Sequence, residues 1–375
     1  MYFRLLATSI LLIVSSILFS QKNTQETKYY KRFQGSIGEN INVTANIVRL
    51  YDNISGNYVY YFSDENNEMY YGETIELSGS IDKYDSLKLR EFGSEEYTFI
   101  GLIEGGNYDG VWNTDEEKPI DFEMKEYYPN GSLPFEIYYL NSEHKLDNNN
   151  TDSPVAEIEL TIIYPTNKYF QPSIADSVKD IIAQSYFGKG FDLVEPQSML
   201  DNFEKEYFDN YDKQTKSWHE VGGASFNWEK MINMSVVYNS NYLLCTEYLR
   251  YAYAGGAHGM SNLSYDIINL DNGSKMFYKD IFVDNIDSTL TLMLTNQLRA
   301  DYQIPEEINL KDAGFFVEQV NPNKNLFVDA GGIGFVYNSY EIAPYSKGAT
   351  RILLSFDKIK HLVKPNTPVY RMSQR

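Results

Sequence analysis

Two glycine-rich segments carry the residues whose types and spacing are best suited to chemistry. The first, Tyr-Ala-Tyr-Ala-Gly-Gly-Ala-His-Gly at 251–259, places His258 in a turn between two strand-like runs. The second, at 331–345, contains Glu341 shortly before a proline and a tyrosine. His258 could act as a general base or contact a ligand, with Glu341 as its carboxylate partner. A His–carboxylate pair without a nucleophile is a weak indication of catalysis.

A structural role explains the same residues. Glycines allow positive φ or the close approach of another segment, and the imidazole of His258 could hydrogen-bond a nearby backbone group and fix the turn. Glu341 could equally satisfy backbone groups in its own turn. The candidate binding residues are Tyr253, His258, Tyr265, Glu341 and Tyr345. The residues expected to shape the two segments are Gly255, Gly256, Gly259, Gly332, Gly334 and Pro344.

The sequence indicates neither a metal site nor a cofactor site. Cys245 is the single cysteine, which excludes a cysteine-based metal site, and its apolar surroundings predict a small buried side chain. The four histidines form no closely spaced pair, and the acidic runs at 64–68 and 115–117 lack the pattern of an EF-hand. The glycines at 331–334 lack the lysine and Ser/Thr of a P-loop. We therefore expect no cofactor and no bound metal.

The elements that position these residues fall into two regions. Over 29–140, short strand-like runs alternate with turn residues at intervals of roughly ten, which is typical of an antiparallel sandwich or barrel. This pattern predicts a small N-terminal all-β domain. Residues 141–153 are polar, rich in asparagine and followed by Pro154, which predicts a linker. Strands are expected at 41–48, 56–62, 74–79, 86–91, 97–102 and 121–124.

The second region, 154–365, mixes helices and strands without regular alternation, which indicates an α+β domain. Apolar stripes predict three helices. The first begins after a capping Ser173, and the other two cover 198–213 and 285–300. A short helix at 356–363 is expected before a loose tail marked by Pro365 and Pro368. Strands are expected at 155–164, 231–238, 242–253, 264–270, 326–328, 334–337 and 351–355.

Composition narrows the range of partners. The net charge is −20 and the isoelectric point is near 4.6, which argues against nucleic acid and anionic membrane surfaces because both need Lys and Arg. A cationic partner is electrostatically easier, although net charge also serves solubility alone. The 33 tyrosines suit strands and half-exposed surfaces, and they can stack on sugars.

The N-terminus has the composition of an export signal. Arg4 precedes an apolar run at 5–19, which is short for a bilayer span of roughly 20 residues. We predict a signal peptide at 1–20 that is cleaved after Ser20, with an uncleaved anchor as the alternative. No cysteine follows the run, so a lipid-anchored lipoprotein is not expected. The mature chain is expected to be periplasmic or secreted, with no membrane contact after cleavage.

The glycine segments resemble a known family. The run from Tyr253 to Gly259, then Tyr265-Asp266 and Asp280-Ile-Phe282, and finally the block at 332–348 resemble the signature of an extracytoplasmic domain of unknown function. That domain forms the C-terminal part of RsiV-type anti-sigma factors and accompanies PdaC-type peptidoglycan deacetylases. The resemblance covers 155–363 and implies a two-lobed α+β fold outside the cytoplasmic membrane of bacteria.

The resemblance also limits what the chain can do. Met1 to Arg4 is too short to hold the sigma-binding segment of an anti-sigma factor, and the deacetylase's paired histidines are missing. The resemblance therefore implies the accessory domain. Two functions stay open. The first is a binding or sensor module for cell-wall glycan or for a cell-wall enzyme such as lysozyme, a basic muramidase that RsiV-type relatives are associated with sensing. The alternative is a wall-polymer hydrolase that uses His258 and a carboxylate.

Overall fold

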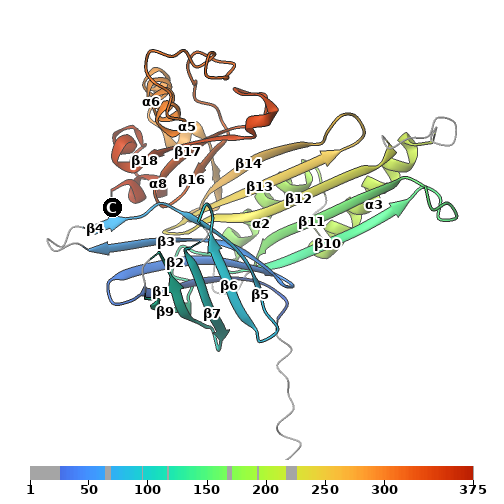
Figure 1. The fold of residues 1–375 in the computed structure, drawn as a ribbon, viewed down its shortest axis with the longest axis horizontal. Coiled ribbons are helices and arrows are strands. Elements are labelled where there is room, and N and C mark those ends of the chain that lie inside the picture. The colour runs from blue at the N-terminus through green and yellow to red at the C-terminus, as the bar shows by residue number, and fades with distance from the viewer. Residues whose placement is uncertain are drawn as a thin grey trace, which may run out of the picture.

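The computed structural model describes residues 26–63, 69–94, 96–115, 118–166, 171–191, 194–216 and 226–374. Within these residues the chain forms three sheets and three hydrophobic cores. Figure 1 shows the N-terminal strands in blue and teal, a long sheet in green to gold, and the C-terminal elements in orange and red at one end of that sheet. The signal peptide predicted at 1–20 lies outside the described residues.

The N-terminal strands form a closed antiparallel barrel, which confirms the predicted all-β region. They are β1 (Lys28–Ile37), β2 (Ile41–Leu50), β3 (Asn53–Ser63), β4 (Met69–Tyr71), β5 (Ile75–Ile81), β6 (Ser86–Glu91), β7 (Thr98–Glu104), β8 (Asn107–Asn113) and β9 (Ile120–Glu126). Eight strands pair in the order β2-β1-β9-β8-β7-β6-β5-β3, and β3 pairs back to β2 while β4 extends from β3. Alternating inward residues fill the barrel, and Phe33, Leu89 and Phe99 are buried.

Glycines permit the barrel to curve at points of close strand approach. A Cβ added to Gly35 would lie 1.9 Å from the carbonyl oxygen of Glu123 on the paired strand. The same is true of Gly79 and the carbonyl oxygen of Lys88, also at 1.9 Å. No other residue type fits such contacts, so these glycines act as bends in the wall of the barrel.

A six-stranded sheet forms the centre of the molecule. It runs β10 (Phe135–Lys145), β11 (Val155–Pro165), β12 (Trp228–Ser240), β13 (Leu243–Tyr253), β14 (Met260–Asn269) and β15 (Ser274–Met276). The pairing of β11 with β12 is parallel, and the other pairings are antiparallel. The crossover between β11 and β12 contains the helices α2 (Pro172–Phe187) and α3 (Pro196–Gln214), which cover one face of the sheet.

The structure corrects the predicted linker at 141–153. Residues from Asn141 to Lys145 belong to β10. The pairing of β10 with β11 extends from Phe135, opposite Pro165, to Lys145, opposite Val155. The asparagine-rich segment is therefore the turn of a hairpin. Asn and Asp side chains favour turns because they hydrogen-bond the backbone nearby, as Asp147 does at the N–H of Asn149. The barrel ends with β9, so the break between the sheets falls before Phe135.

The start of the first helix also differs from the prediction. The N-cap of α2 is Gln171, and Pro172 occupies the first turn, so Ser173 lies inside the helix. Proline suits this position because its missing N–H would have no partner there. The predicted apolar stripe is present, with Ile174, Val178 and Ile182 buried against the sheet.

The C-terminal elements pack on the other face of the six-stranded sheet. They are α5 (Tyr278–Ile281), α6 (Asp287–Asp301), β16 (Leu326–Val328), β17 (Gly332–Tyr337), η2 (Tyr345–Lys347), β18 (Thr350–Ser355), α7 (Phe356–Ile359), η3 (Lys360–Leu362) and α8 (Pro368–Ser373). Strands β16, β17 and β18 form the three-stranded sheet. The shared core contains Cys245 from β13, which is fully buried as predicted. The expected loose tail is instead α8, because Val369 and Met372 are buried in this core.

Polar groups join the barrel to the six-stranded sheet. The Arg32 Nε–H donates to the carbonyl oxygen of Asn239 at 3.1 Å, and Asn57 Nδ2 donates to the carbonyl oxygen of Val236 at 2.8 Å. The helices and the three sheets together confirm the predicted mixed α+β class. Within the described residues, no helix combines the length and the apolar character needed to cross a bilayer.

Candidate functional site

The two glycine-rich segments identified in the sequence meet in the structure. The turn between β13 and β14 carries His258, whose ring stacks on Tyr345 with centroids 4.2 Å apart and planes at 27°. The Tyr345 ring also stacks on Tyr340, at 5.9 Å and 28°. Tyr345 therefore lies between the other two rings, and we refer to His258, Tyr340 and Tyr345 as the aromatic cluster.

Hydrogen bonds hold the aromatic cluster to the turn. The carbonyl oxygen of Gly259 can only accept, so the Nδ1 of His258, 2.8 Å away, must carry its proton to hydrogen-bond it. The Tyr345 hydroxyl donates to the same carbonyl oxygen at 3.1 Å. The remaining ring nitrogen, Nε2, lies 3.5 Å from the Tyr340 hydroxyl. These contacts are the ones that a structural role for His258 requires.

Backbone geometry explains why the turn is glycine-rich. Gly255 and Gly256 have φ of 88° and 104°, which L side chains rarely adopt. A Cβ on Gly259 would lie 2.3 Å from the Tyr251 hydroxyl oxygen, so this position must be glycine for the tyrosine to pack there. Tyr253 closes the turn by donating its hydroxyl hydrogen to the carbonyl oxygen of Gly256 at 3.1 Å.

The second segment holds Tyr340 in a strained conformation. Its φ is +72°, a value that is uncommon for any residue with a Cβ and an outlier for a bulky one. Tyr340 is also 48% exposed, and Tyr345 is 37% exposed. Strain of this kind persists only where the surroundings enforce it, and it is frequent at functional sites.

The other predicted residues of this segment have different places. The described contacts of His258 involve Gly259, Tyr340 and Tyr345, so Glu341 is not its carboxylate partner. Gly332 and Gly334 lie within β17, and a Cβ on Gly334 would lie 1.9 Å from the Phe327 ring. Pro344 is the N-cap of η2, and Tyr345 is the first residue of that short helix.

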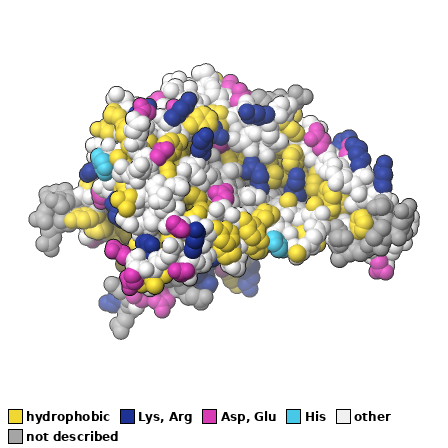
Figure 2. All heavy atoms as spheres, turned by 90° about the horizontal axis from the view of Figure 1, so that it is seen from above, with side chains coloured by type: hydrophobic (Ala, Val, Ile, Leu, Met, Phe, Trp, Pro, Cys, Tyr) yellow, Lys and Arg dark blue, Asp and Glu magenta, His cyan; other side chains and the backbone are white. Residues whose placement is uncertain are grey.

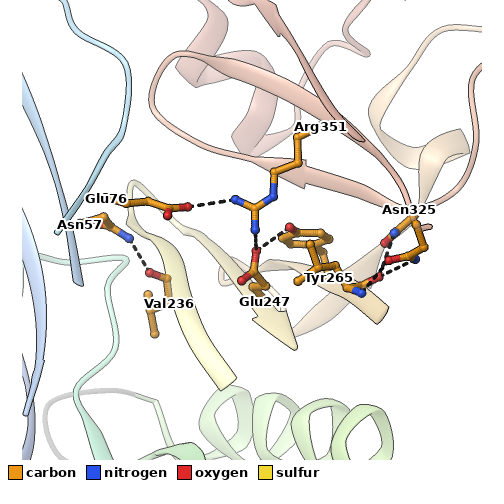
Figure 3. Close-up of polar contacts among 9 residues, drawn as sticks. Asn57, Glu76, Val236, Glu247, Tyr265, Asn325 and Arg351 are labelled. Carbon is orange, nitrogen blue, oxygen red and sulfur yellow. Dashed lines mark hydrogen bonds and ion pairs between the residues drawn. The ribbon is translucent and has the colours of Figure 1, made fainter. Parts of the chain in front are cut away.

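Tyr265 belongs to a separate site at the junction of the three sheets. Its hydroxyl donates to Glu247 Oε2 at 2.5 Å, and the same carboxylate forms a 2.7 Å salt bridge with Arg351. Arg351 also reaches Glu76 of the barrel at 2.9 Å. Figure 3 shows Arg351 pointing down from the C-terminal elements between the two carboxylates. One guanidinium therefore connects all three sheets.

These residues line a cleft of about 590 Å³ between the barrel and both other sheets. Most of its polar lining consists of amides and hydroxyls, which can both donate and accept hydrogen bonds. These residues are Asn46, Ser55, Asn57, Thr74, Ser78, Asn233 and Ser235. A cleft of this size can hold a small molecule or one unit of an oligomer. We call it the junction cleft.

The junction cleft and the aromatic cluster lie on the same face of β13. Glu247 and Leu249 line the cleft, and Tyr251 follows at the two-residue spacing that keeps side chains on one face of a strand. The Tyr251 ring packs against Gly259, whose carbonyl oxygen is held by Tyr345. The face thus runs from the cleft to the cluster.

Asp329 is the most deeply buried carboxylate at the junction cleft, with 5% of its surface exposed. Burial raises its pKa to about 6, while hydrogen bonds from the backbone N–H groups of Gly332 and Gly331 partly oppose the shift. Among the described residues, no group of three or more His, Cys, Asp or Glu side chains is arranged to hold a metal ion.

Sequence reasoning found the aromatic cluster, apart from Tyr340, but missed most of the junction cleft. Glu76, Glu247 and Arg351 come from three different sheets and share no motif. An isolated charged residue within a strand is ordinary in a sequence. The only signal was Tyr265, which entered through the family signature and not through its chemistry.

The fold and these sites define an α+β domain built on glycine-fixed turns, preceded by a β-barrel. Residues 133–261 match the family model described as Deacetylase PdaC, and residues 279–357 match that of DUF3298, a protein family of unknown function. The resemblance predicted from the glycine segments is confirmed. The matched regions indicate an extracytoplasmic accessory domain.

One solved structure agrees with this assignment. A DUF3298 family member from Bacteroides fragilis is 25% identical, with a TM-score of 0.62, and the match covers 66% of this chain and 100% of that one. A DUF3298 family protein from Pseudomonas aeruginosa is 16% identical, covering 62% of this chain and 96% of that one with a TM-score of 0.44, too low to support an argument. A search of curated proteins finds no match.

Proposed function

We propose that the chain is an extracytoplasmic binding module of the bacterial cell envelope whose ligand is cell-wall glycan. The observation that carries the proposal is the exposed aromatic cluster on the same face as the amide- and hydroxyl-lined junction cleft. Sugar rings present apolar faces that pack on aromatic rings, and hydroxyls that hydrogen-bond to amides and carboxylates. The cluster supplies the first kind of contact and the cleft supplies the second.

Binding suits these groups better than hydrolysis does. Hydrolysis by histidine needs a nucleophile or a water that the imidazole activates, with a third group that orients the ring. His258 is oriented by a backbone carbonyl group and stacked on a tyrosine. The carboxylates Glu76 and Glu247 are both paired with Arg351, so each already serves in a salt bridge.

Co-sedimentation with purified peptidoglycan tests the proposal. The wild-type chain is expected to pellet with the polymer, and Tyr345→Ala is expected to weaken binding at least about tenfold because it removes the central ring. Tyr84→Ala is the matched control, since Tyr84 is 72% exposed in the turn between β5 and β6 of the barrel. Equal retention of Tyr345→Ala and wild type would refute the proposed role of the cluster.

A basic muramidase such as lysozyme is a second candidate ligand. The net charge of −20 favours it, because opposite charges speed encounter. Figure 2 shows Lys and Arg side chains interspersed with Asp and Glu on the face seen from above, so the acidity is not gathered into one patch there. Calorimetry at low and physiological salt, with cytochrome c as a basic control, separates specific from nonspecific attraction. Equal binding of both proteins at low salt, lost for both at physiological salt, would exclude this candidate.

A further inference from the structure

A second cleft lies on the helix-covered face of the six-stranded sheet. It has a volume of about 710 Å³ and opens where α2 ends, beside Phe187 and Gly188. Its lining includes three basic residues, one from each of β12, β13 and β15, in a chain with a net charge of −20. They are Lys230, Arg250 and Lys275. We call this the basic cleft.

Strand register brings two of these cations together. Ile232 of β12 pairs with Arg250 of β13, and Lys230 pairs with Ala252. Lys230 and Arg250 are therefore diagonal neighbours on one face of the sheet, about 7–8 Å apart at their Cα atoms. Burial lowers the pKa of Lys230, and the charge of Arg250 lowers it further. Burial also lowers the pKa of Arg250.

The one acidic residue in the lining is already neutralised. Asp266 is 1% exposed and forms an ion pair with Lys275. It also accepts hydrogen bonds from Ser185 Oγ at 3.0 Å and from the Tyr248 hydroxyl at 2.7 Å. Three cations and one anion leave the lining with a charge of +2, which resides on Lys230 and Arg250.

Both remaining cations have unused hydrogen-bond donors. Within the described chain, the ammonium of Lys230 contacts the Phe203 and Tyr207 rings, with Nζ 5.0 and 5.3 Å from their centroids, and no carboxylate. Arg250 donates through Nη1 to Ser264 Oγ at 2.7 Å and through Nη2 to the Ser185 carbonyl oxygen. A guanidinium has five N–H groups, so three are left. Adjacent, partly buried like charges are unfavourable, and a bound anion relieves their repulsion.

We propose that the basic cleft binds an oxyanion group, a carboxylate or a phosphate, between Lys230 and Arg250. Arg250 presents planar donors that match such a group, and Lys230 adds a point charge. The apolar lining at Phe187, Ala252 and Met260 accommodates the organic part of the ligand. This site is on the opposite face of β13 from the aromatic cluster, so it goes beyond the proposed glycan binding and stands independently of it.

Titration calorimetry in phosphate-free buffer at constant ionic strength tests the site. The probes are inorganic phosphate, N-acetylmuramic acid and the matched neutral sugar N-acetylglucosamine. We expect one or both anions to bind and the neutral sugar not to bind at this site. Lys230→Met keeps the aliphatic contact with the rings and is expected to raise the Kd at least about tenfold. Lys205→Met is the control, because Lys205 is exposed on α3.

The thermal stability of the unliganded protein gives a second readout. Lys230→Met removes the repulsion from Arg250, so its melting temperature is expected to be equal to or above that of wild type while anion binding is lost. Binding of phosphate alone identifies a phosphate-bearing ligand, and binding of N-acetylmuramic acid alone identifies a carboxylate-bearing one. Absence of binding by both at about 10 mM, or equal losses in Lys230→Met and Lys205→Met, would overturn the proposal.

Discussion

Arg351 and Glu247 form a 2.7 Å salt bridge that joins the three-stranded sheet to the six-stranded sheet. Glu247 is 18% exposed at its side chain, and Arg351 also holds Glu76 of the barrel. The position of one guanidinium thus couples the barrel to the domain that carries the aromatic cluster.

Replacement of this arginine is expected to destabilise the whole chain. Arg351→Met keeps the aliphatic part but leaves the half-buried Glu247 without its cation, so the free energy of unfolding should fall by about 1–3 kcal/mol. Urea denaturation measures the change. Lys311→Met is the control, because its pair with Glu318 is exposed on both sides and should contribute under about 1 kcal/mol. Equal effects of the two substitutions would contradict the coupling.

The raised pKa of Asp329 predicts how the free energy of unfolding depends on pH. Its folded pKa is about 6, whereas an unfolded aspartate titrates near 3.9. Between about pH 4 and 6 the folded state binds more protons than the unfolded state, so the contribution of Asp329 to the free energy of unfolding falls as pH rises. Asp329→Asn keeps an acceptor oxygen for the N–H groups of Gly331 and Gly332. It is expected to stabilise the protein above pH 6, by up to about 3 kcal/mol, and to have little effect at pH 4.

Denaturation of wild type and Asp329→Asn at a series of pH values measures this difference. The exposed loop variant Asp312→Asn provides the control and is expected to show no comparable dependence between pH 4 and 6. A constant difference between Asp329→Asn and wild type over this range would contradict the assignment.

Asn239 is expected to be the most sensitive polar residue between the barrel and the six-stranded sheet. It is 2% exposed, and its amide exchanges hydrogen bonds with the backbone of Leu133 at 2.8 and 2.7 Å and donates to the Tyr30 hydroxyl at 2.9 Å. Asn239→Ala leaves these groups unpaired and should cost about 3 kcal/mol in unfolding free energy. Asn309→Ala, in an exposed loop, should cost less than about 1 kcal/mol. A small effect of Asn239→Ala would show that water replaces its bonds.

Local patterns predicted the elements better than their assembly. The alternation at 86–91 predicted β6 with its observed ends, and the apolar run at 326–328 did the same for β16. The closure of the barrel depends on the pairing of β1 with β9, its first and last strands in the sequence, and no local pattern reports it. The linker prediction at 141–153 was wrong because an asparagine-rich run has the same composition in a hairpin turn as in a linker.

The candidate site was predictable only where it is local in sequence. His258 stood out because glycines surround it, and Tyr345 because it follows a proline. Tyr340 did not, since a tyrosine gives no sequence sign of a φ of +72°. The basic cleft was equally hidden, because Lys230 and Arg250 meet through strand register.

Export is the prediction that depends on the sequence alone. Arg4 and the apolar run at 5–19 predict removal of about 20 residues during secretion. N-terminal sequencing of the protein recovered from outside the cytoplasm should begin at Gln21. Recovery of intact Met1 in a membrane fraction would replace the cleaved signal with an anchor.

The most direct test of glycan binding is titration of a short β-1,4-linked N-acetylglucosamine oligosaccharide into wild type, Tyr340→Gly and the control Tyr84→Ala. Glycine adopts φ of +72° without strain, which offsets part of the stability lost with the ring contact to Tyr345, and the melting temperatures of all three proteins are measured beside their affinities. Tyr340→Gly is expected to lose at least about tenfold in affinity, whereas Tyr84→Ala is expected to bind like wild type. Equal affinity of all three proteins, or no binding by wild type, would contradict this prediction.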